Sequence, residues 1–233
     1  LRARKAQLLG QKDYASTIIP RRTAPSPEAV EELIAKVVPT AMKQAKREQE
    51  RLALYALDHD GLSDFAVWDH AYYASKVRSA DYSVDEAVLS QYFELDRVLH
   101  DGVFFAANQL FGITMEPRQD LVGYRDDVRV WEVKDSDQVS IGLFVGDYYT
   151  RTTKQGGAWM TSLRDAADLL EELPVILNVM NVNRSAPGEP TLLSLDEITT
   201  MFHEFGHALH GLLSTTEYPS VSGTSVPTDF VEF

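Results

Sequence analysis

The segment from Ser194 to Leu212 constrains the fold of this chain more than any other. Ser194 and Glu197 have the spacing of a capping box, in which each side chain satisfies a backbone N–H of the other residue. Apolar residues follow at intervals of four and three, the period of an amphipathic helix; they are Ile198, Phe202, Phe205, Leu209 and Leu212. We therefore predict a helix that begins after Ser194 and packs this stripe against a core.

The same helix carries two histidines four residues apart, with a glutamate directly after the first. His203, Glu204 and His207 form the pattern H-E-x-x-H. At ~100° and ~1.5 Å per residue, the two imidazoles lie ~40° apart and about one turn up, where both can reach one metal ion. All three side chains are predicted to point away from the apolar stripe. Zinc is the metal that suits such a site.

A hydrolytic zinc site has a third protein ligand and leaves the fourth position for water. The metzincin pattern would place a glycine at position 210 and a histidine at position 213, but the chain has His210 and Leu213 there. The candidate that remains is Glu232, on a helix that we expect to begin near Pro227. Because Asp229 and Glu232 have the spacing of a capping box, Glu232 has two alternative roles, as a helix cap or as a surface charge.

Several motifs extend this pattern along the chain. After the helix come Tyr218-Pro219, Ser222-Gly223-Thr224 and Asp229-Phe230-Val231-Glu232-Phe233, and before it come Tyr92-Phe93-Glu94-Leu95, Asp101-Gly102-Val103-Phe104-Phe105-Ala106, Val128-Arg129-Val130-Trp131-Glu132-Val133 and Gly156-Gly157-Ala158-Trp159-Met160. Together with the histidine motif they resemble the thimet-oligopeptidase family (M3) of zinc peptidases over the whole chain. The branch most similar is that of the bacterial peptidyl-dipeptidases, which remove C-terminal dipeptides.

The resemblance implies a cofactor, site residues and a fold. In that family the two motif histidines and the downstream glutamate bind zinc, which corresponds to His203, His207 and Glu232. The motif glutamate is the general base, which corresponds to Glu204. The implied fold is the zincin-like catalytic region of a helical oligopeptidase.

The implied function is that of a zinc metallopeptidase that hydrolyses short peptides and releases C-terminal dipeptides. Two alternatives stay open, an endo-acting oligopeptidase of the same family and an inactive partial zinc site. The chain opens on Leu1 and stops one residue after Glu232. We therefore expect an internal fragment of a larger peptidase, inactive when isolated.

Composition excludes several other classes of protein. The 35 acidic and 22 basic residues give a net charge of −13, which argues against a nucleic-acid partner. The absence of cysteine excludes disulfides and thiolate ligands, and fits cytoplasm, which we predict, as well as periplasm. No apolar run approaches the ~20 residues of a membrane span, so no membrane partner is expected. The oligomeric state stays open.

The hydrophobic periodicity predicts a mainly α fold with a small β-sheet (α+β). We expect residues 1–120 to be a helical segment, and residues 121–233 to hold the sheet and the metal helix. Helices are predicted at 27–38, at 41–54 after a break at Pro39, at 65–79, from Ser83, and as one long buried helix at 92–111. Strands are predicted at 128–133, 139–147, 158–163 and 174–180, the first two as a hairpin.

Two glycine positions have a possible functional meaning. Gly157 and Ala158 introduce a predicted strand that lies beside the catalytic helix in the resembling peptidases, and glycine lets an extended peptide backbone approach an edge strand. The alternative is a tight turn into an ordinary strand. Gly206 lies inside the metal helix, where glycine costs roughly 1 kcal/mol relative to alanine, so we expect close packing there.

Overall fold

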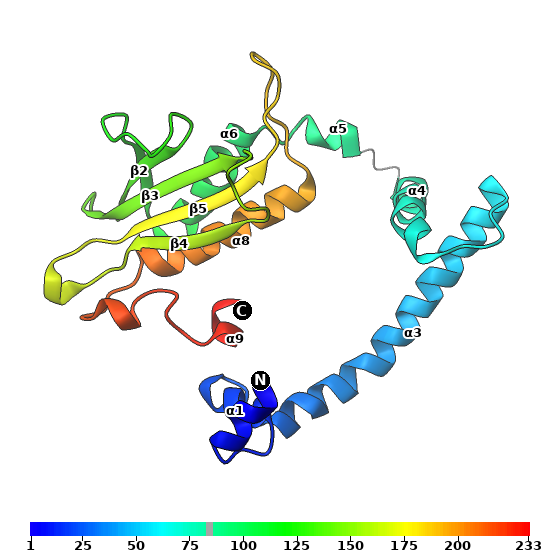
Figure 1. Ribbon diagram of the computed structural model, residues 1–233. Helices are drawn as coiled ribbons and strands as arrows, with labels where there is room; N and C mark the ends of the chain where they lie inside the picture. The colour runs from blue at the N-terminus through cyan, green and yellow to red at the C-terminus, as the bar shows by residue number, and fades with distance from the viewer. Residues whose placement is uncertain (83–85) are drawn as a thin grey trace. The chain divides into compact units, whose positions relative to one another are not determined.

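A computed structural model describes residues 1–82 and 86–233 of the chain (Figure 1). The helix predicted from Ser83 begins outside the described residues. The chain divides into two compact units. The first unit comprises residues 1–85 together with Pro227–Phe233, and the second comprises residues 86–226.

The first unit is helical in its described residues. Its elements are α1 (Arg2–Leu8), α2 (Tyr14–Ile18), the 3₁₀ turn η1 (Ile19–Arg21), α3 (Pro27–Asp60), the 3₁₀ turn η2 (Val67–Asp69), α4 (His70–Tyr82) and α9 (Thr228–Val231). The break predicted at Pro39 is wrong, because α3 runs for 34 residues through that position. A proline inside a helix removes one backbone hydrogen bond, and the strong helix formers on both sides of Pro39 outweigh that loss. The helix ends where Gly61 adopts a left-handed conformation, with φ at 70°.

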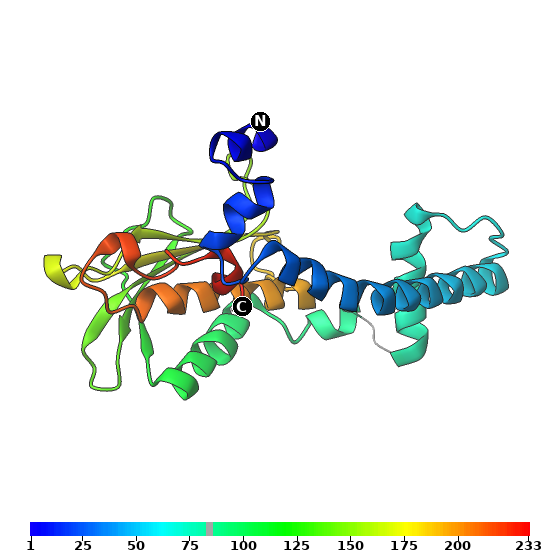
Figure 2. The same ribbon diagram turned by 90° about the horizontal axis from the view of Figure 1, so that it is seen from below.

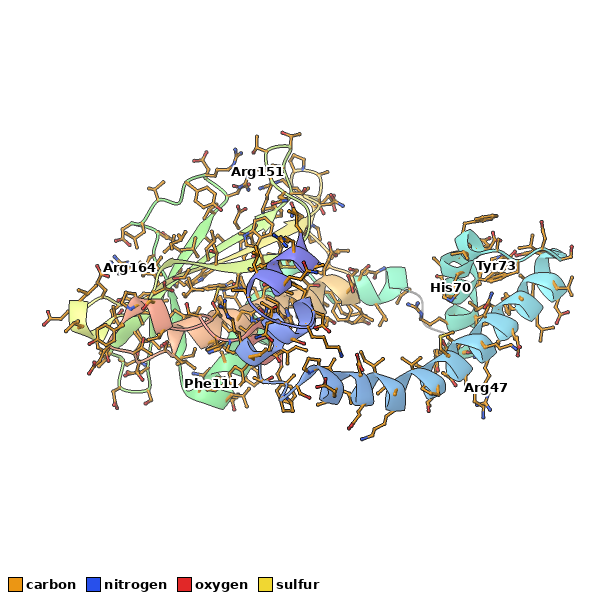
Figure 3. The ribbon with its side chains drawn as sticks, turned by 60° about the horizontal axis from the view of Figure 1, so that its bottom comes forward. Arg47, His70, Tyr73, Phe111, Arg151 and Arg164 are labelled. Carbon is orange, nitrogen blue, oxygen red and sulfur yellow. The ribbon has the colours of Figure 1, made fainter. Side chains whose placement is uncertain are left out.

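The core of this unit is small. It consists of Leu52 and Ala56 of α3 packed against Tyr73 and Val77 of α4, with Tyr73 labelled in Figure 3. The apolar stripe in the N-terminal half of α3 is exposed in the structure; its exposed members are Leu33, Ile34, Val37, Val38 and Met42. Periodicity predicted the helix correctly, but it did not predict burial.

The second unit is built on a five-stranded sheet with strand order β1-β2-β3-β5-β4. The strands are β1 (Thr114–Pro117), β2 (Arg129–Lys134), β3 (Ser140–Tyr149), β4 (Trp159–Arg164) and β5 (Val175–Val182). All pairs are antiparallel except β3 with β5, which is parallel. The four predicted strands and the β2–β3 hairpin are confirmed, whereas β1 was not predicted. In the described residues β4 pairs only with β5, so it is an edge strand.

Helical segments come before, between and after the strands of this unit in the sequence. They are α5 (Glu86–Ser90), α6 (Leu95–Arg97), the π-helical turns η3 (Val98–Phe104), α7 (Phe105–Phe111), the 3₁₀ turns η4 (Asp168–Leu170) and η5 (Pro219–Val221), and α8 (Leu195–Leu212). The long helix predicted at 92–111 is thus present from Leu95 to Phe111, with π-helical turns in its middle. Its predicted burial is wrong at Phe105 and Leu110, which are exposed.

The main core lies between the sheet and two helical segments on one of its faces. Phe104 of η3 and Phe205 of α8 both contact Phe144 of β3, with ring centroids 6.1 and 5.2 Å apart. Helix α8 packs against β3, β5 and β4, and Figures 1 and 2 show it running along the face of the sheet. The helix that carries the two motif histidines is therefore supported by the main core.

The arrangement of helices with a mixed sheet confirms an α+β fold, while the zincin-like architecture stays a prediction. The compact units differ from the division predicted at residue 120, because the helical stretch Leu95–Phe111 belongs with the sheet. The domain division of the whole protein therefore also stays a prediction. Within the described residues, no helix has both the length and the apolar character needed to cross a membrane.

Candidate metal centre

The start of α8 is fixed by the predicted capping box. Ser194 Oγ accepts a hydrogen bond from the backbone N–H of Glu197 at 3.2 Å. In return, Glu197 Oε2 accepts from the backbone N–H of Ser194 at 2.8 Å. Both N–H groups are thereby hydrogen-bonded, so the residue at which α8 begins is set by local contacts.

The buried face of α8 is rotated from the predicted stripe. Its buried residues are Met201, Glu204, Phe205, Ala208, Gly211 and Leu212, whereas Phe202 is 41% exposed. At ~100° per residue, the centre of this face lies ~80° from the centre of the predicted stripe. The reason is the small side chains on that face, which let the helix approach the sheet: a Cβ at Gly211 would lie 2.6 Å from Ile176 Cδ1.

The two histidines lie off this face and converge on each other. His203 is exposed and His207 is half-buried. Their Nε2 atoms are 3.0 Å apart, and their ring planes meet at 85°. Two nitrogen ligands at ~2.05 Å from a tetrahedral zinc ion lie ~3.3 Å apart. The pair therefore has nearly the separation that one shared ion requires, and these two side chains could hold a metal.

The contacts of α8 also place the histidines relative to the sheet. Leu212 approaches β3, where its Cδ2 would lie 3.0 Å from a Cβ at Gly142. Gly211, ~100° further round, faces Ile176 of β5 and Met160 of β4. The next positions in the same sense are those of His207 and His203, which therefore project beyond β4. The candidate metal position is beside the free edge of the sheet.

Glu204 was predicted to point away from the core. The structure differs, since this side chain is buried and only 8% exposed. It lies seven residues before Gly211, which is ~10 Å along the axis and ~20° around it. A strand covers that distance in about three residues, so helix geometry puts Glu204 over β5 and β4, about three residues along β5 from Ile176 and so close to Asn178 and Val179. The carboxylate is thus on the same helix as the histidines, at the boundary between the metal face and the core.

Glu232 lies at the C-terminal cap of α9 and is exposed. The predicted helix entry at Pro227 is confirmed. Helix α9 begins at Thr228, so Asp229 lies inside the helix and is not its N-cap, which removes the capping-box role considered for Glu232. Asp229 instead accepts hydrogen bonds from Thr23 Oγ1 at 2.7 Å and Thr23 N at 2.9 Å. These bonds lower the pKa of Asp229. The structure does bring His203 and His207 together, whereas the role of Glu232 as a third ligand stays a prediction.

Gly157 and Ala158 lie at the entry to the edge strand β4. Gly157 is exposed with φ at 92°, a conformation that favours glycine. Its carbonyl accepts a hydrogen bond of 2.7 Å from Asn181 Nδ2, which also donates to the carbonyl of Gln155. Ala158 is half-buried against the main core. This entry is consequently held in place from the neighbouring strand β5, a contact that no sequence motif indicated.

The loop before Gly157 is anchored by a buried charge cluster. Asp147, at the end of β3, accepts hydrogen bonds from Arg151 at 2.8 Å, Lys154 at 2.9 Å and the hydroxyl of Tyr124 at 2.5 Å. Burial raises the pKa of Asp147, but the hydrogen bonds outweigh it and lower the value to about 2. Arg151 is labelled in Figure 3. The cluster holds residues 147–154 together and so helps to position the entry to β4.

Close packing was predicted at Gly206, but the structure shows it at Gly211. Within the described residues, no atom lies within 4 Å of a Cβ built at Gly206. Gly223 lies in the loop after α8, and a Cβ atom at this position would be 3.1 Å from the Cα of Gly211. The N–H of Gly223 donates a hydrogen bond to Ser214 Oγ at 3.0 Å. The motif Ser222-Gly223-Thr224 therefore folds this loop back onto the helix. An open pocket of about 580 Å³ remains along Gly206 and His210.

Comparison with known proteins decides the family. All residues from 1 to 233 match the family described as "Peptidase family M3". The chain belongs to peptidase family M3. Its resemblance to that family in the sequence motifs is thereby confirmed.

Curated relatives lie in the same family. Over all 233 residues the chain is 44% identical to a dipeptidyl carboxypeptidase of Escherichia coli, of which it covers 34%. It is 36% identical to oligopeptidase A of the same organism, with all of the chain and 35% of that protein aligned. It is 30% identical to a mitochondrial intermediate peptidase of Arabidopsis thaliana, with 97% of the chain and 33% of that protein aligned. This M3 chain spans about a third of the length of these relatives.

Proposed function

We propose that the complete protein is a zinc-dependent peptidase that hydrolyses short peptides and releases their C-terminal dipeptides. The observation that carries the proposal is the convergence of the His203 and His207 Nε2 atoms, 3.0 Å apart, on a helix that also carries Glu204. Membership of family M3 supports peptide hydrolysis. The 44% identity to a protein named dipeptidyl carboxypeptidase supports the release of dipeptides.

In this proposal His203, His207 and Glu232 hold the zinc ion. Each offers a ligand atom of a kind that zinc accepts, two imidazole nitrogens and one carboxylate oxygen. When bound, zinc supplies a Lewis acid for the scissile carbonyl and for the attacking water. The histidines are carried by a helix that the main core supports, so their geometry is set before any ion binds.

Glu204 is the proposed general base. It takes the proton of the attacking water and passes it to the leaving amine, as a carboxylate beside a metal site can. Its position suits this role because α8 fixes it one residue from His203 and the sheet buries it to 8% exposure. A buried, positioned carboxylate loses little conformational freedom when it reacts.

The free edge of β4 is the proposed place for the peptide. An extended peptide can add to an exposed strand edge through main-chain hydrogen bonds. Gly157 has no side chain to obstruct such a peptide, and Ala158 has only a methyl group. The histidines project beyond the same edge, so a peptide there would present its bonds to the metal position.

The second candidate is an endo-acting oligopeptidase, which the 36% identity to oligopeptidase A favours. The two candidates differ in whether the substrate's free C-terminus is needed. The test is to incubate the complete protein with one defined peptide as the free acid and as the C-terminal amide, and to identify products by mass spectrometry. We expect stepwise loss of dipeptides from the acid and little cleavage of the amide. Equal internal cleavage of both would favour the oligopeptidase, and no chelator-sensitive cleavage of either would leave a metal site without catalysis.

The role of Glu232 needs a separate experiment. If it is a ligand, Glu232→Ala in the complete protein should lower zinc stoichiometry and activity together, because a two-histidine site holds zinc weakly. Metal analysis after dialysis measures the first and peptide cleavage the second. Glu217→Ala is a matched control, since Glu217 is another exposed glutamate outside the proposed site. Unchanged zinc content in Glu232→Ala would exclude Glu232 as a ligand and leave it a surface charge.

A further inference from the structure

A row of four residues crosses the side of the sheet that faces α8. Arg129 of β2 pairs with Gly146 of β3, Gly146 pairs with Asn178 of β5, and Asn178 pairs with Met160 of β4. Arg129 forms an ion pair with Asp96 of α6 at the outer end of the row. Asn178 lies within the row and is only 2% exposed. Two polar side chains, Arg129 and Asn178, thus lie in an otherwise apolar interface.

The gap over Gly146 is filled by Tyr148 of the same strand. A Cβ at Gly146 would lie 2.5 Å from the Tyr148 ring and 2.8 Å from its hydroxyl oxygen. The ring therefore folds back over the glycine, and only glycine leaves room for it. This places the Tyr148 hydroxyl above the centre of the row, beside Asn178 on the neighbouring strand.

Two buried polar atoms in this place have no hydrogen-bond partner among the described residues. They are the Tyr148 hydroxyl and Asn178 Oδ1. A buried polar atom without a partner destabilises the fold, and proteins usually satisfy such atoms with an internal water. Burial raises the pKa of Tyr148, so its hydroxyl keeps its proton and donates. A donor and an acceptor side by side are what one water molecule needs.

Glu204 belongs to α8 and is buried. Because it lies seven residues before Gly211, which approaches Ile176 and Met160, helix geometry puts its side chain over β5 and β4 within about one residue of Asn178. A water molecule between Tyr148 and Asn178 would accept one hydrogen bond from the tyrosine and donate one to Oδ1. Its second proton remains to be donated, and the Glu204 carboxylate is an acceptor next to that position.

We propose that Tyr148 and Asn178 hold a buried water molecule that donates a hydrogen bond to Glu204, so that both are positioning residues for this carboxylate. The catalytic part of the proposal rests on the proposed peptidase function, whereas the water site itself does not. The site would fix Glu204 from the core side, opposite the side that faces the substrate. Substitutions of such outer partners commonly cost 10–100-fold in activity.

The test uses Tyr148→Phe, Asn178→Leu and the double variant of the complete protein, with Tyr149→Phe as the matched control. The Tyr149→Phe control removes the same kind of hydroxyl but keeps the aromatic ring, whose centroid lies 3.9 Å from Cζ of Arg184. We expect each single variant to melt at a lower temperature and to lose about tenfold in kcat, with KM and zinc content unchanged. The double variant should be no worse than the worse single one, because both remove the same water. The control should match the wild type.

Three results would overturn the proposal. A Tyr148→Phe variant that melts at the same or a higher temperature would show that the hydroxyl has no partner. Effects of the two single changes that simply add would exclude a shared water. A lower melting temperature with unchanged kcat would exclude positioning of Glu204. If the wild type cleaves no peptide, the proposed function fails by itself, while the melting temperatures still decide the water site.

Discussion

Helices α8 and α3 begin in the same way and end up in different surroundings. Ser194 and Ser26 each cap the first turn, through the N–H of Glu197 and of Ala29 at 3.2 Å in both cases. Both sequences continue with apolar residues at helical spacing. Yet α8 buries one face against a sheet, whereas α3 buries only Leu52 and the neighbouring Ala56 near its C-terminal end. Local signals therefore start a helix, but only a second surface gives it a buried side.

The difference bears on where a functional site can form. Histidine occurs on both helices, but His59 of α3 stacks on Tyr55, with ring centroids 3.9 Å apart, and its Nδ1 contacts the Tyr55 carbonyl. His203 and His207 of α8 are held as a pair because the opposite face of their helix is fixed on the sheet. A supported helix can present two ligands with a set separation, which an exposed one does less well.

The largest expected effect comes from removing one of the paired histidines. In the complete protein, His207→Ala should lose most of its bound zinc and nearly all activity, because one ligand of the ion is gone. His59→Ala, on α3, should retain both. Metal analysis and peptide cleavage measure these outcomes. Full zinc content in His207→Ala would remove α8 from the metal site and end the functional distinction between the helices.

Glu204→Gln should separate chemistry from metal binding. The change keeps size and hydrogen-bonding shape but removes the proton acceptor, so we expect kcat to fall by about 10²–10⁴-fold with zinc content unchanged. Glu32→Gln on α3 is the matched control and should leave kcat as it is. Steady-state kinetics with parallel metal analysis make the comparison. Wild-type turnover by the glutamine variant would exclude Glu204 from the mechanism.

A stability measurement sharpens the packing difference directly. Phe205→Ala should cost about 3–5 kcal/mol of the free energy of unfolding, because it leaves a cavity among Phe104 and Phe144. Leu33→Ala on α3 should stay within about 0.5 kcal/mol, since Leu33 is exposed. Chemical denaturation of the 233-residue chain gives both values. A comparable loss in Leu33→Ala would mean that this face of α3 is covered in solution.

The smallest expected effect tests what the helices share. Ser194→Ala and Ser26→Ala should each cost about 1 kcal/mol, as the loss of an N-cap does. The loss should be somewhat larger at Ser194, because Glu197 also loses its hydrogen bond from Ser194 Oγ. Denaturation curves of the two variants, compared with that of the wild-type chain, provide the values. A negligible cost at both positions would show that packing alone, and not capping, sets these helix ends.

The sequence by itself determined the features that depend on a few neighbouring residues. The capping box of Ser194, the four-residue spacing of His203 and His207, and the β2–β3 hairpin were all predicted and are all present. The first two depend on hydrogen bonds or helix geometry within about four residues, and the hairpin joins two strands that follow each other directly in the chain, so the local sequence is sufficient. The M3 motifs, read along the chain, were enough to indicate the family.

Only the tertiary structure decided how these elements face one another. Phe202 is exposed and Glu204 is buried because the sheet, through the close approach at Gly211, sets the rotation of α8 about its axis. The insertion of β5 between β3 and β4, which leaves β4 at the edge, likewise depends on pairing between strands distant in sequence. A periodic pattern fixes the angles between side chains on one helix. The direction in which the whole pattern points is set by the surface on which the helix packs.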